Sequence, residues 1–127
     1  ATMIGSDGLP HDRQPHPRLW GAFPRVLGHY ARELQLFSLE EAIHRMTGLS
    51  ARRFDLRGRG EIAVGAHADI VVFDSAKVID RATFAKPETP ADGIDVVAVA
   101  GVVTYRRGSL TGARAGRFLP RLGTGNA

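Results

Sequence analysis

The chain opens on a short apolar run, residues 1–4, which leads directly into the polar sequence Gly5-Ser6-Asp7-Gly8. This pattern is typical of a buried strand that delivers a polar loop. A lone buried strand needs parallel neighbours, and no run of comparable quality follows before Ile70. We therefore expect this chain to be the C-terminal piece of a longer protein.

Residues 9–21 form a long segment rich in proline, histidine and arginine. Pro10, Pro15 and Pro17 predict a loop rather than a helix, because proline lacks the backbone N–H and restricts the residue before it. Loops of this length inside compact domains are usually functional or disordered. This loop is therefore the first place to look for functional side chains.

Two helices are predicted after the loop. Pro24 suits the first position of a helix over residues 24–34, whose apolar residues are spaced to share one face. Ser38, with Glu41 three residues later, is a capping box that begins a second helix over residues 38–47. The residues on the apolar face of the first helix are Phe23, Val26, Leu27, Tyr30 and Leu34.

From Asp55 onward the pattern changes from helical to β-type. Residues 70–73 are a continuous apolar run that predicts a strand. Residues 96–99 and 102–105 are β-type runs on either side of Ala100-Gly101, which predicts a hairpin with a tight turn. The expected divisions are residues 1–54 with a strand and helices, residues 55–112 as a small β unit, and residues 113–127 as a basic tail.

The composition is that of a globular protein. Of 127 residues, 43% are hydrophobic and 24% charged, which excludes wholesale disorder and allows one domain or two small ones. No run of about 18 apolar residues is present, so no membrane partner is expected. Cysteine is absent, which excludes disulfides, thiolate catalysis and cysteine-ligated zinc within these residues. A cytoplasmic location is expected.

The C-terminal part of the chain is basic. From Val96 to the end there is no Asp or Glu, and the formal net charge of the whole chain is +4. Such a tail can bind polyanions, but a solubilising terminus rich in glycine is the interpretation we prefer. No aromatic residues are interleaved at a spacing that favours base stacking, so a nucleic-acid partner is not expected. The arginines of this region are Arg106, Arg107, Arg114, Arg117 and Arg121.

Asp7 is the first candidate for chemistry. It follows a predicted buried strand and precedes a glycine, and active sites of α/β architectures lie at the carboxyl ends of strands. A carboxylate at this position can bind a metal, take a proton from water or give a proton to a leaving group. Asp-Gly is also a common turn dipeptide, so a purely structural role stays open.

Histidine and arginine side chains share the loop with Asp7. His11 and His16 could suggest a metal cluster with Asp7, but no H-x-H or H-x-x-x-H pair fixes such a geometry. A polar rim is the simpler interpretation of both histidines. Arg13 and Arg18 can each hold a substrate carboxylate through paired hydrogen bonds, although a solvated surface arginine is the default for each.

Several stretches of this sequence resemble one known family. Residues 58–74 are similar to the C-terminal signature of the amidohydrolase superfamily, G-x-I-x-x-G-x-x-A-D-[IL]-V-x-[FL]-D, and residues 99–103 resemble its downstream hairpin. Residues 5–28 closely resemble N-acyl-D-amino-acid deacylases, and residues 111–117 resemble their C-terminal tail. Many amidohydrolases share the signature, whereas the Ser-Asp-Gly-to-Trp loop is the specific part.

The resemblance implies an α/β fold, a TIM barrel with a small β-sandwich beside it. Residues 1–6 would be the eighth barrel strand, and the two predicted helices would pack on the outer wall of the barrel. Residues 60–74 and 94–106 would be strands of the sandwich. A complete barrel needs at least ~200 residues, so this chain would supply only the last barrel strand and its helices plus the C-terminal strands of the sandwich.

The resemblance also implies zinc-dependent hydrolysis of N-acyl-D-amino acids to a D-amino acid and a carboxylate. Asp7 would be the catalytic carboxylate facing the zinc site, Arg18 would hold the α-carboxylate of the substrate, and His11 would also bind substrate. The family's zinc ligands, a cysteine and several histidines on earlier strands, have no counterpart here. The chain alone is therefore expected to be inactive, and its expected partners are the missing N-terminal part of the barrel or a second copy.

Two alternatives stay open at this point. Another amidohydrolase chemistry, the opening of a hydantoin or dihydropyrimidine ring, would use the same fold. Arg18 argues for an acyl amino acid, because a free α-carboxylate needs a cation whereas a neutral ring amide does not. The other alternative is a non-enzymatic interaction module that packs on a partner chain or binds polyanions through its arginine tail.

Overall fold

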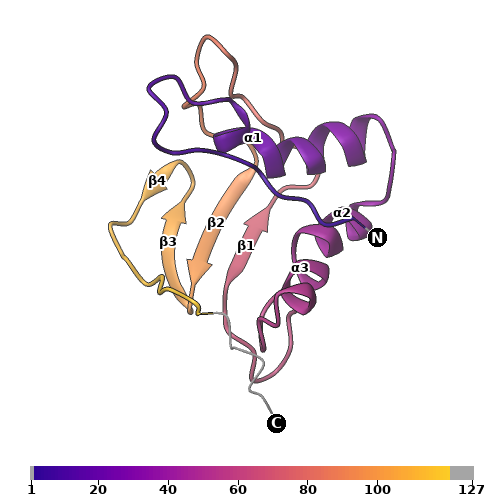
Figure 1. The fold of residues 1–127 in the computed structure, drawn as a ribbon, viewed down its shortest axis with the longest axis vertical. Coiled ribbons are helices and arrows are strands. Elements are labelled where there is room, and N and C mark those ends of the chain that lie inside the picture. The colour runs from indigo at the N-terminus through magenta and orange to yellow at the C-terminus, as the bar shows by residue number, and fades with distance from the viewer. Residues whose placement is uncertain (1, 121–127) are drawn as a thin grey trace.

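The computed structural model describes residues 2–120, in which helical segments are followed along the chain by a four-stranded sheet (Figure 1). Ala1 and Arg121 lie outside the described residues. No helix within residues 2–120 is long and apolar enough to cross a membrane. The helical segments are α1 (Arg18–Arg25), η1 (Val26–Glu33), α2 (Leu39–Met46) and α3 (Gly48–Arg53), and the strands are β1 (Ile70–Phe73), β2 (Ile94–Val99), β3 (Val102–Arg106) and β4 (Ser109–Leu110).

The strand expected at the N-terminus is not formed within the described residues. Residues 2–9 have no strand partner in the structure, and the Ile4 N–H donates to the Arg45 carbonyl at 3.3 Å instead. Ile4 nevertheless packs against the hydrophobic core. A strand is defined by hydrogen bonds to its neighbours, and residues 2–120 offer this run none.

The first helix begins earlier than predicted, at Arg18 with Pro17 as its N-cap, so the expected loop ends within residues 9–21 rather than after them. Pro24 lies inside α1 rather than at its start. Proline removes one helical hydrogen bond and clashes with the carbonyl four residues earlier. The chain continues directly from α1 into η1, a π-helical segment in which backbone bonds span five residues.

The buried face of this helix is narrower than the predicted one. Val26, Leu27 and Ala31 are buried, whereas Tyr30 and Leu34 of the predicted apolar face are 37% and 50% exposed. The predicted face assumed the α-helical spacing of 3.6 residues per turn. Phe23, in the α-helical part, is also 43% exposed, so the exposure of the predicted face is not confined to the π-helical segment.

The second predicted helix is confirmed as α2. The Ser38 Oγ accepts a hydrogen bond from the Glu41 N–H at 3.2 Å, which satisfies one free donor of the first turn. The Glu41 carboxylate does not close the capping box; it accepts from Arg45 Nε at 2.7 Å. The hydrogen bond from Arg45 lowers the pKa of Glu41. Ala42, on the apolar stripe of this helix, is completely buried.

The predicted strand over residues 70–73 and the predicted hairpin are both confirmed. The sheet is antiparallel with the order β1-β2-β3-β4, and Val99 pairs with Val102 across the turn. Ala100 and Gly101 have positive φ angles of 50° and 80°, as a tight turn matched to the strand twist requires. Strand β4 is an addition that the sequence pattern did not reveal.

Of the sandwich strands expected over residues 60–74, only Ile70–Phe73 forms one in the structure, and residues 60–69 do not. This stretch consists of turns and irregular chain, and Ile62 and Val64 are almost fully exposed. Apolar side chains that alternate with small or polar ones suit a sheet face, but a sheet needs a neighbouring strand. No strand lies beside this stretch within the described residues.

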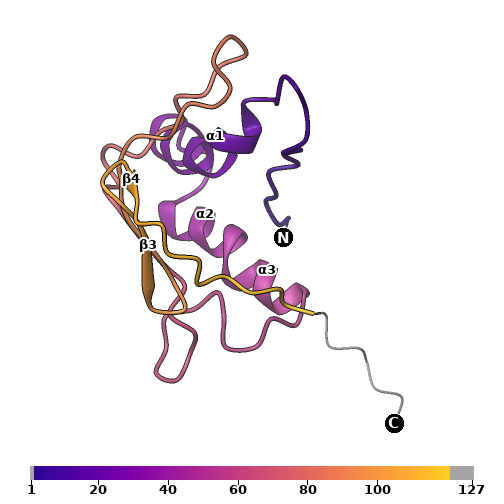
Figure 2. The ribbon, with the colours of Figure 1, turned by 90° about the vertical axis from the view of Figure 1, so that its left-hand side faces the viewer.

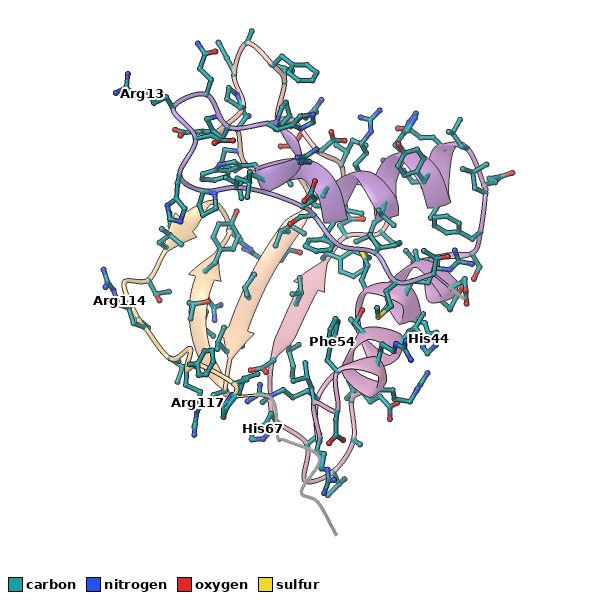
Figure 3. All side chains as sticks on the ribbon, viewed as in Figure 1. Arg13, His44, Phe54, His67, Arg114 and Arg117 are labelled. Atoms are coloured by element: carbon teal, nitrogen blue, oxygen red, sulfur yellow. The ribbon has the colours of Figure 1, made fainter. Side chains whose placement is uncertain are left out.

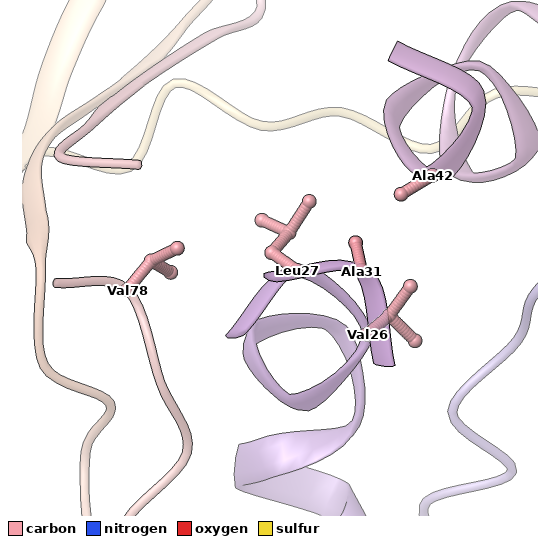
Figure 4. Close-up of a cluster of buried hydrophobic side chains, with 5 residues drawn as sticks. All are labelled: Val26, Leu27, Ala31, Ala42 and Val78. Atoms are coloured by element: carbon pink, nitrogen blue, oxygen red, sulfur yellow. The ribbon is translucent and has the colours of Figure 1, made fainter. Parts of the chain in front are cut away.

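The core lies between the helices and the connection from β1 to β2. In Figure 2 the sheet is seen close to edge-on, and α1, α2 and α3 all lie on the same side of it. Figure 4 shows Val78 facing side chains of η1 and α2. Val78 is completely buried, and a buried valine contributes about 1.5–3 kcal/mol relative to an exposed one. The core cluster consists of Val26, Leu27, Ala31, Ala42 and Val78.

Two glycines let the helix approach this connection closely. A Cβ on Gly28 would lie 2.3 Å from the Val78 carbonyl oxygen, and a Cβ on Gly21 would lie 2.9 Å from Asp80. Arginines four residues after each glycine complete the contact. Arg32 Nη1 donates to the Val78 carbonyl at 2.7 Å, and Arg25 Nη1 donates to Asp80 Oδ2 at 3.2 Å.

Asp69 ties the loop before β1 to the hairpin turn. Its Oδ1 accepts from the Ala100 N–H at 2.8 Å, and its Oδ2 pairs with Arg59. The Gly101 N–H donates to the neighbouring Ala68 carbonyl at 2.9 Å. The Ala-Asp pair of the sequence signature is therefore a structural device that fixes the hairpin against the start of β1.

We expect Asp69→Ala to lower the free energy of unfolding by about 1–2 kcal/mol, because it removes a charge-assisted hydrogen bond and a partly exposed ion pair. Asp69→Asn keeps an oxygen for the Ala100 N–H and is expected to lose less. Urea denaturation measures both, with Asp12→Ala on the exposed N-terminal loop as the control. An Asp69→Ala midpoint equal to that of the unmodified protein would contradict this role.

Candidate functional site

Asp7 lies in the loop between the N-terminal run and α1. Its φ angle of 49° is in the left-handed region, which aspartate tolerates better than most side chains. The Ser6 Oγ accepts from the Gly8 N–H at 3.3 Å and tightens the turn around it. The Asp7 side chain is 83% exposed, so the carboxylate is presented to solvent.

Arg18, the first residue of α1, contacts Asp7 at two points. Its Nε donates to the Asp7 carbonyl oxygen at 2.8 Å, and its Nη2 lies 2.9 Å from the carboxylate Oδ2. A Cβ on Gly8 would lie 2.7 Å from Leu19 Cδ1, so glycine lets the loop rest against the first turn of α1. The structure thus brings together two residues that the sequence singled out separately.

This ion pair stays open to competition. The Arg18 side chain is 40% exposed, and exposed ion pairs contribute about 0–1 kcal/mol. A carboxylate of another molecule could therefore replace Asp7 on the guanidinium at little cost. The pair places the Asp7 carboxylate, which can accept and donate a proton, beside the Arg18 guanidinium. A guanidinium can bind a carboxylate through two parallel hydrogen bonds.

His16 takes part in the same constellation, which the sequence did not reveal. Its Nδ1 accepts a hydrogen bond from the Arg18 N–H at 3.0 Å. Its ring packs edge-on against Phe84, with 4.9 Å between the ring centroids. The sequence placed His16 in the same loop as Asp7 but favoured a polar rim for it, and it did not indicate that a helix begins two residues later. No sequence signal pointed to Phe84, because it comes from the connection between β1 and β2.

The structure does not bring His11 or Arg13 to the Asp7–Arg18 pair. His11 is exposed at a turn, and within residues 2–120 its side chain forms no hydrogen bond. In Figure 3 the side chain of Arg13 points away from the molecule at the edge of the loop. Arg114 and Arg117 of the basic tail also project outward in this view.

Metal ligands do not gather in the described part of the chain. Among residues 2–120 no group of three histidine or acidic side chains is placed to hold a metal ion. Zinc sites in proteins use three or four protein ligands. The Asp7 carboxylate, the most accessible acid of the site, has none of these companions beside it.

Comparison with known proteins gives a consistent result. Residues 1–105 match the model of the amidohydrolase family. The chain is 60% identical over 120 residues to a D-aminoacylase of Alcaligenes xylosoxydans xylosoxydans, which covers 94% of this chain and 25% of that protein. The chain spans about a quarter of the length of the relatives it matches.

Two solved structures resemble the chain closely. One is a D-aminoacylase studied for its binuclear metal centre, with activation by one metal and attenuation by the second. It is 58% identical to this chain with a TM-score of 0.92. The match covers 94% of this chain and 25% of that one. The other is an N-acyl-D-glutamate deacylase of Bordetella bronchiseptica with zinc and a phosphonate mimic of the tetrahedral intermediate. Its TM-score is 0.80 at 53% identity, over 81% of this chain and 22% of that one.

We expect the 127-residue chain on its own to retain no stoichiometric zinc after gel filtration and to hydrolyse no N-acetyl-D-methionine when zinc is added. The reason is the missing ligand set among the described residues. Atomic absorption measures the zinc, and release of free amine measures turnover. One tightly held zinc per chain, or turnover well above background, would contradict this expectation.

Proposed function

Because this chain belongs to the amidohydrolase family, we propose that the protein of which it forms part hydrolyses the amide bond of N-acyl-D-amino acids. The observation that carries the proposal is the Asp7–Arg18 pair, an accessible carboxylate held beside a carboxylate-binding guanidinium. The similarity to a D-aminoacylase and to an N-acyl-D-glutamate deacylase supports the same substrate class.

In this proposal residues 1–54 form the last strand and helices of a TIM barrel, and residues 55–112 form strands of a small β-sandwich. The unpaired run at Ile4 suits a strand whose parallel neighbours belong to other parts of the protein. The exposed Ile62 and Val64 suit a sandwich whose remaining strands come from elsewhere. The residues after 112 form the basic tail.

Asp7 is the proposed acid and base of the reaction. As water adds to the amide carbonyl, its carboxylate accepts a proton from that water. It then gives the proton to the amide nitrogen as the C–N bond breaks, which releases a D-amino acid and a carboxylate. A positioned acid or base contributes typically about 10²–10⁴-fold to a rate.

The described residues do not by themselves fit a zinc ion. The ligands would come from the rest of the protein, and zinc there would make water a better nucleophile at neutral pH. The contribution of this chain is the proton transfer by Asp7 and the placement of the substrate.

Arg18 is the proposed binding group for the α-carboxylate of the substrate. The guanidinium can bind this carboxylate through bidentate hydrogen bonds. The substrate carboxylate displaces the Asp7 carboxylate, because the exposed Asp7–Arg18 ion pair is weak. The substrate then replaces Asp7 on Arg18 and leaves the Asp7 carboxylate free for the proton. His11, in the same loop, is a second proposed substrate contact.

We expect Asp7→Asn in the full-length protein to lower kcat by at least about 10²-fold with N-acetyl-D-methionine, because an amide cannot carry the proton. The shape of the side chain is kept, so KM is expected to change little. Steady-state kinetics at neutral pH measure both constants. Amide cleavage at the unmodified rate would contradict the assignment.

We expect Arg18→Lys to lower kcat/KM about tenfold to hundredfold, mainly through KM, because lysine cannot form the two-pronged contact. The control is hydantoin, which has no free carboxylate. Full-length protein that opens hydantoin faster than it cleaves N-acetyl-D-methionine would favour cyclic amides as the substrate class instead.

A further inference from the structure

We propose that His16 is a positioning residue for Arg18. Its Nδ1 fixes the first turn of α1 at the place where the Arg18 guanidinium reaches Asp7, and Phe84 fixes the imidazole ring. This inference rests on the proposed function, because it gives Arg18 its substrate-binding role.

The start of α1 depends on residue 16 for its hydrogen bonds. The first N–H groups of a helix have no partner within the helix and are usually capped by a side chain at the N-cap. Here the N-cap is Pro17, whose side chain cannot accept a hydrogen bond. The N–H of Arg18 donates to His16 Nδ1, and that of Leu19 donates to the His16 carbonyl, both at 3.0 Å.

The segment that carries these bonds is stiff. His16 lies between Pro15 and Pro17, and the proline ring restricts φ, which is −50° at Pro17. A fixed imidazole therefore fixes the backbone of Arg18 two residues later. The Arg18 side chain must in turn satisfy two acceptors on Asp7, at 2.8 and 2.9 Å, so a small shift of the helix start would break at least one contact.

Phe84 contacts the imidazole from outside the loop, although both residues are exposed, Phe84 to 81%. The two rings meet edge to face, with 75° between their planes. An open hollow of about 680 Å³ lies between residues 13–15 and residues 84–89, so the two loops lie beside each other. The same connection contacts α1 through Asp80 and Arg25. The β unit thus helps to set the position of the substrate arginine.

His16 acts through Arg18 rather than on the substrate. Its Nδ1 is occupied by a backbone N–H, and Phe84 packs against the ring. Another side chain whose acceptor atom can bond the Arg18 N–H can therefore replace His16. The side-chain oxygen of asparagine accepts from the N–H two residues later in many turns, which makes His16→Asn the conservative variant and His16→Leu the disruptive one.

The test uses the full-length protein with N-acetyl-D-methionine. We expect His16→Leu to raise KM about tenfold while kcat stays within about twofold, because a non-reacting carboxylate is bound less well. His16→Asn is expected to restore KM to within about threefold of the unmodified value. Phe84→Leu is expected to raise KM less than His16→Leu. His67→Leu, an exposed histidine in a distant turn, is the matched control and should change neither constant (Figure 3).

Crystal structures of the two His16 variants give a readout that does not depend on activity. The Arg18–Asp7 contacts should persist in His16→Asn and be lost in His16→Leu. The inference is overturned if KM and these contacts are unchanged in His16→Leu, if kcat alone falls, or if asparagine fails to rescue. If the unmodified protein hydrolyses no N-acyl-D-amino acid, the proposed function fails, and the two structures still decide whether His16 positions Arg18.

Discussion

The contact between the first helix and the connection from β1 to β2 holds this structure together. Gly28 leaves no side chain between the helix and the Val78 carbonyl, and Arg32 donates a hydrogen bond to that same carbonyl. Val78 itself is completely buried in the core. Within residues 2–120 the helices meet the sheet at this connection and through Phe73 of β1 and Ile94 of β2, which pack against the same core.

The geometry of the candidate site depends on the contact between the first helix and the connection from β1 to β2. Arg18 is at the start of the helix that Gly28 and Arg32 anchor farther along, and Phe84 belongs to the connection on which the helix rests. The loop with Asp7 is held by its two contacts with Arg18 and by the close approach of Gly8 to Leu19. A polar loop thus takes its position from a helix end, a common way for proteins to place functional groups.

Local sequence signals predicted the parts of the structure that depend on near neighbours. The Ser38 cap and the hairpin at Ala100-Gly101 follow from rules that span a few residues, and both are confirmed. The strand expected over residues 1–6 and the first part of the one expected over 60–74 do not form within the described residues, because a strand needs neighbours that a pattern cannot supply. Asp7 and Arg18 could be singled out from their loop and the family resemblance, but their contact with each other is tertiary. The contact of His16 with Phe84 joins residues 68 positions apart, which no local pattern reports.

The π-helical segment η1 has a consequence for how the chain tolerates changes in length. A π-turn holds one residue more than the α-turn it replaces, and such turns occur mostly as short bulges within α-helices. Deleting a single residue between Val26 and Glu33 would let the segment return to α-geometry with both of its ends left in place. The helix therefore contains spare length, and a shortened version of it could still span the same distance between Arg18 and α2.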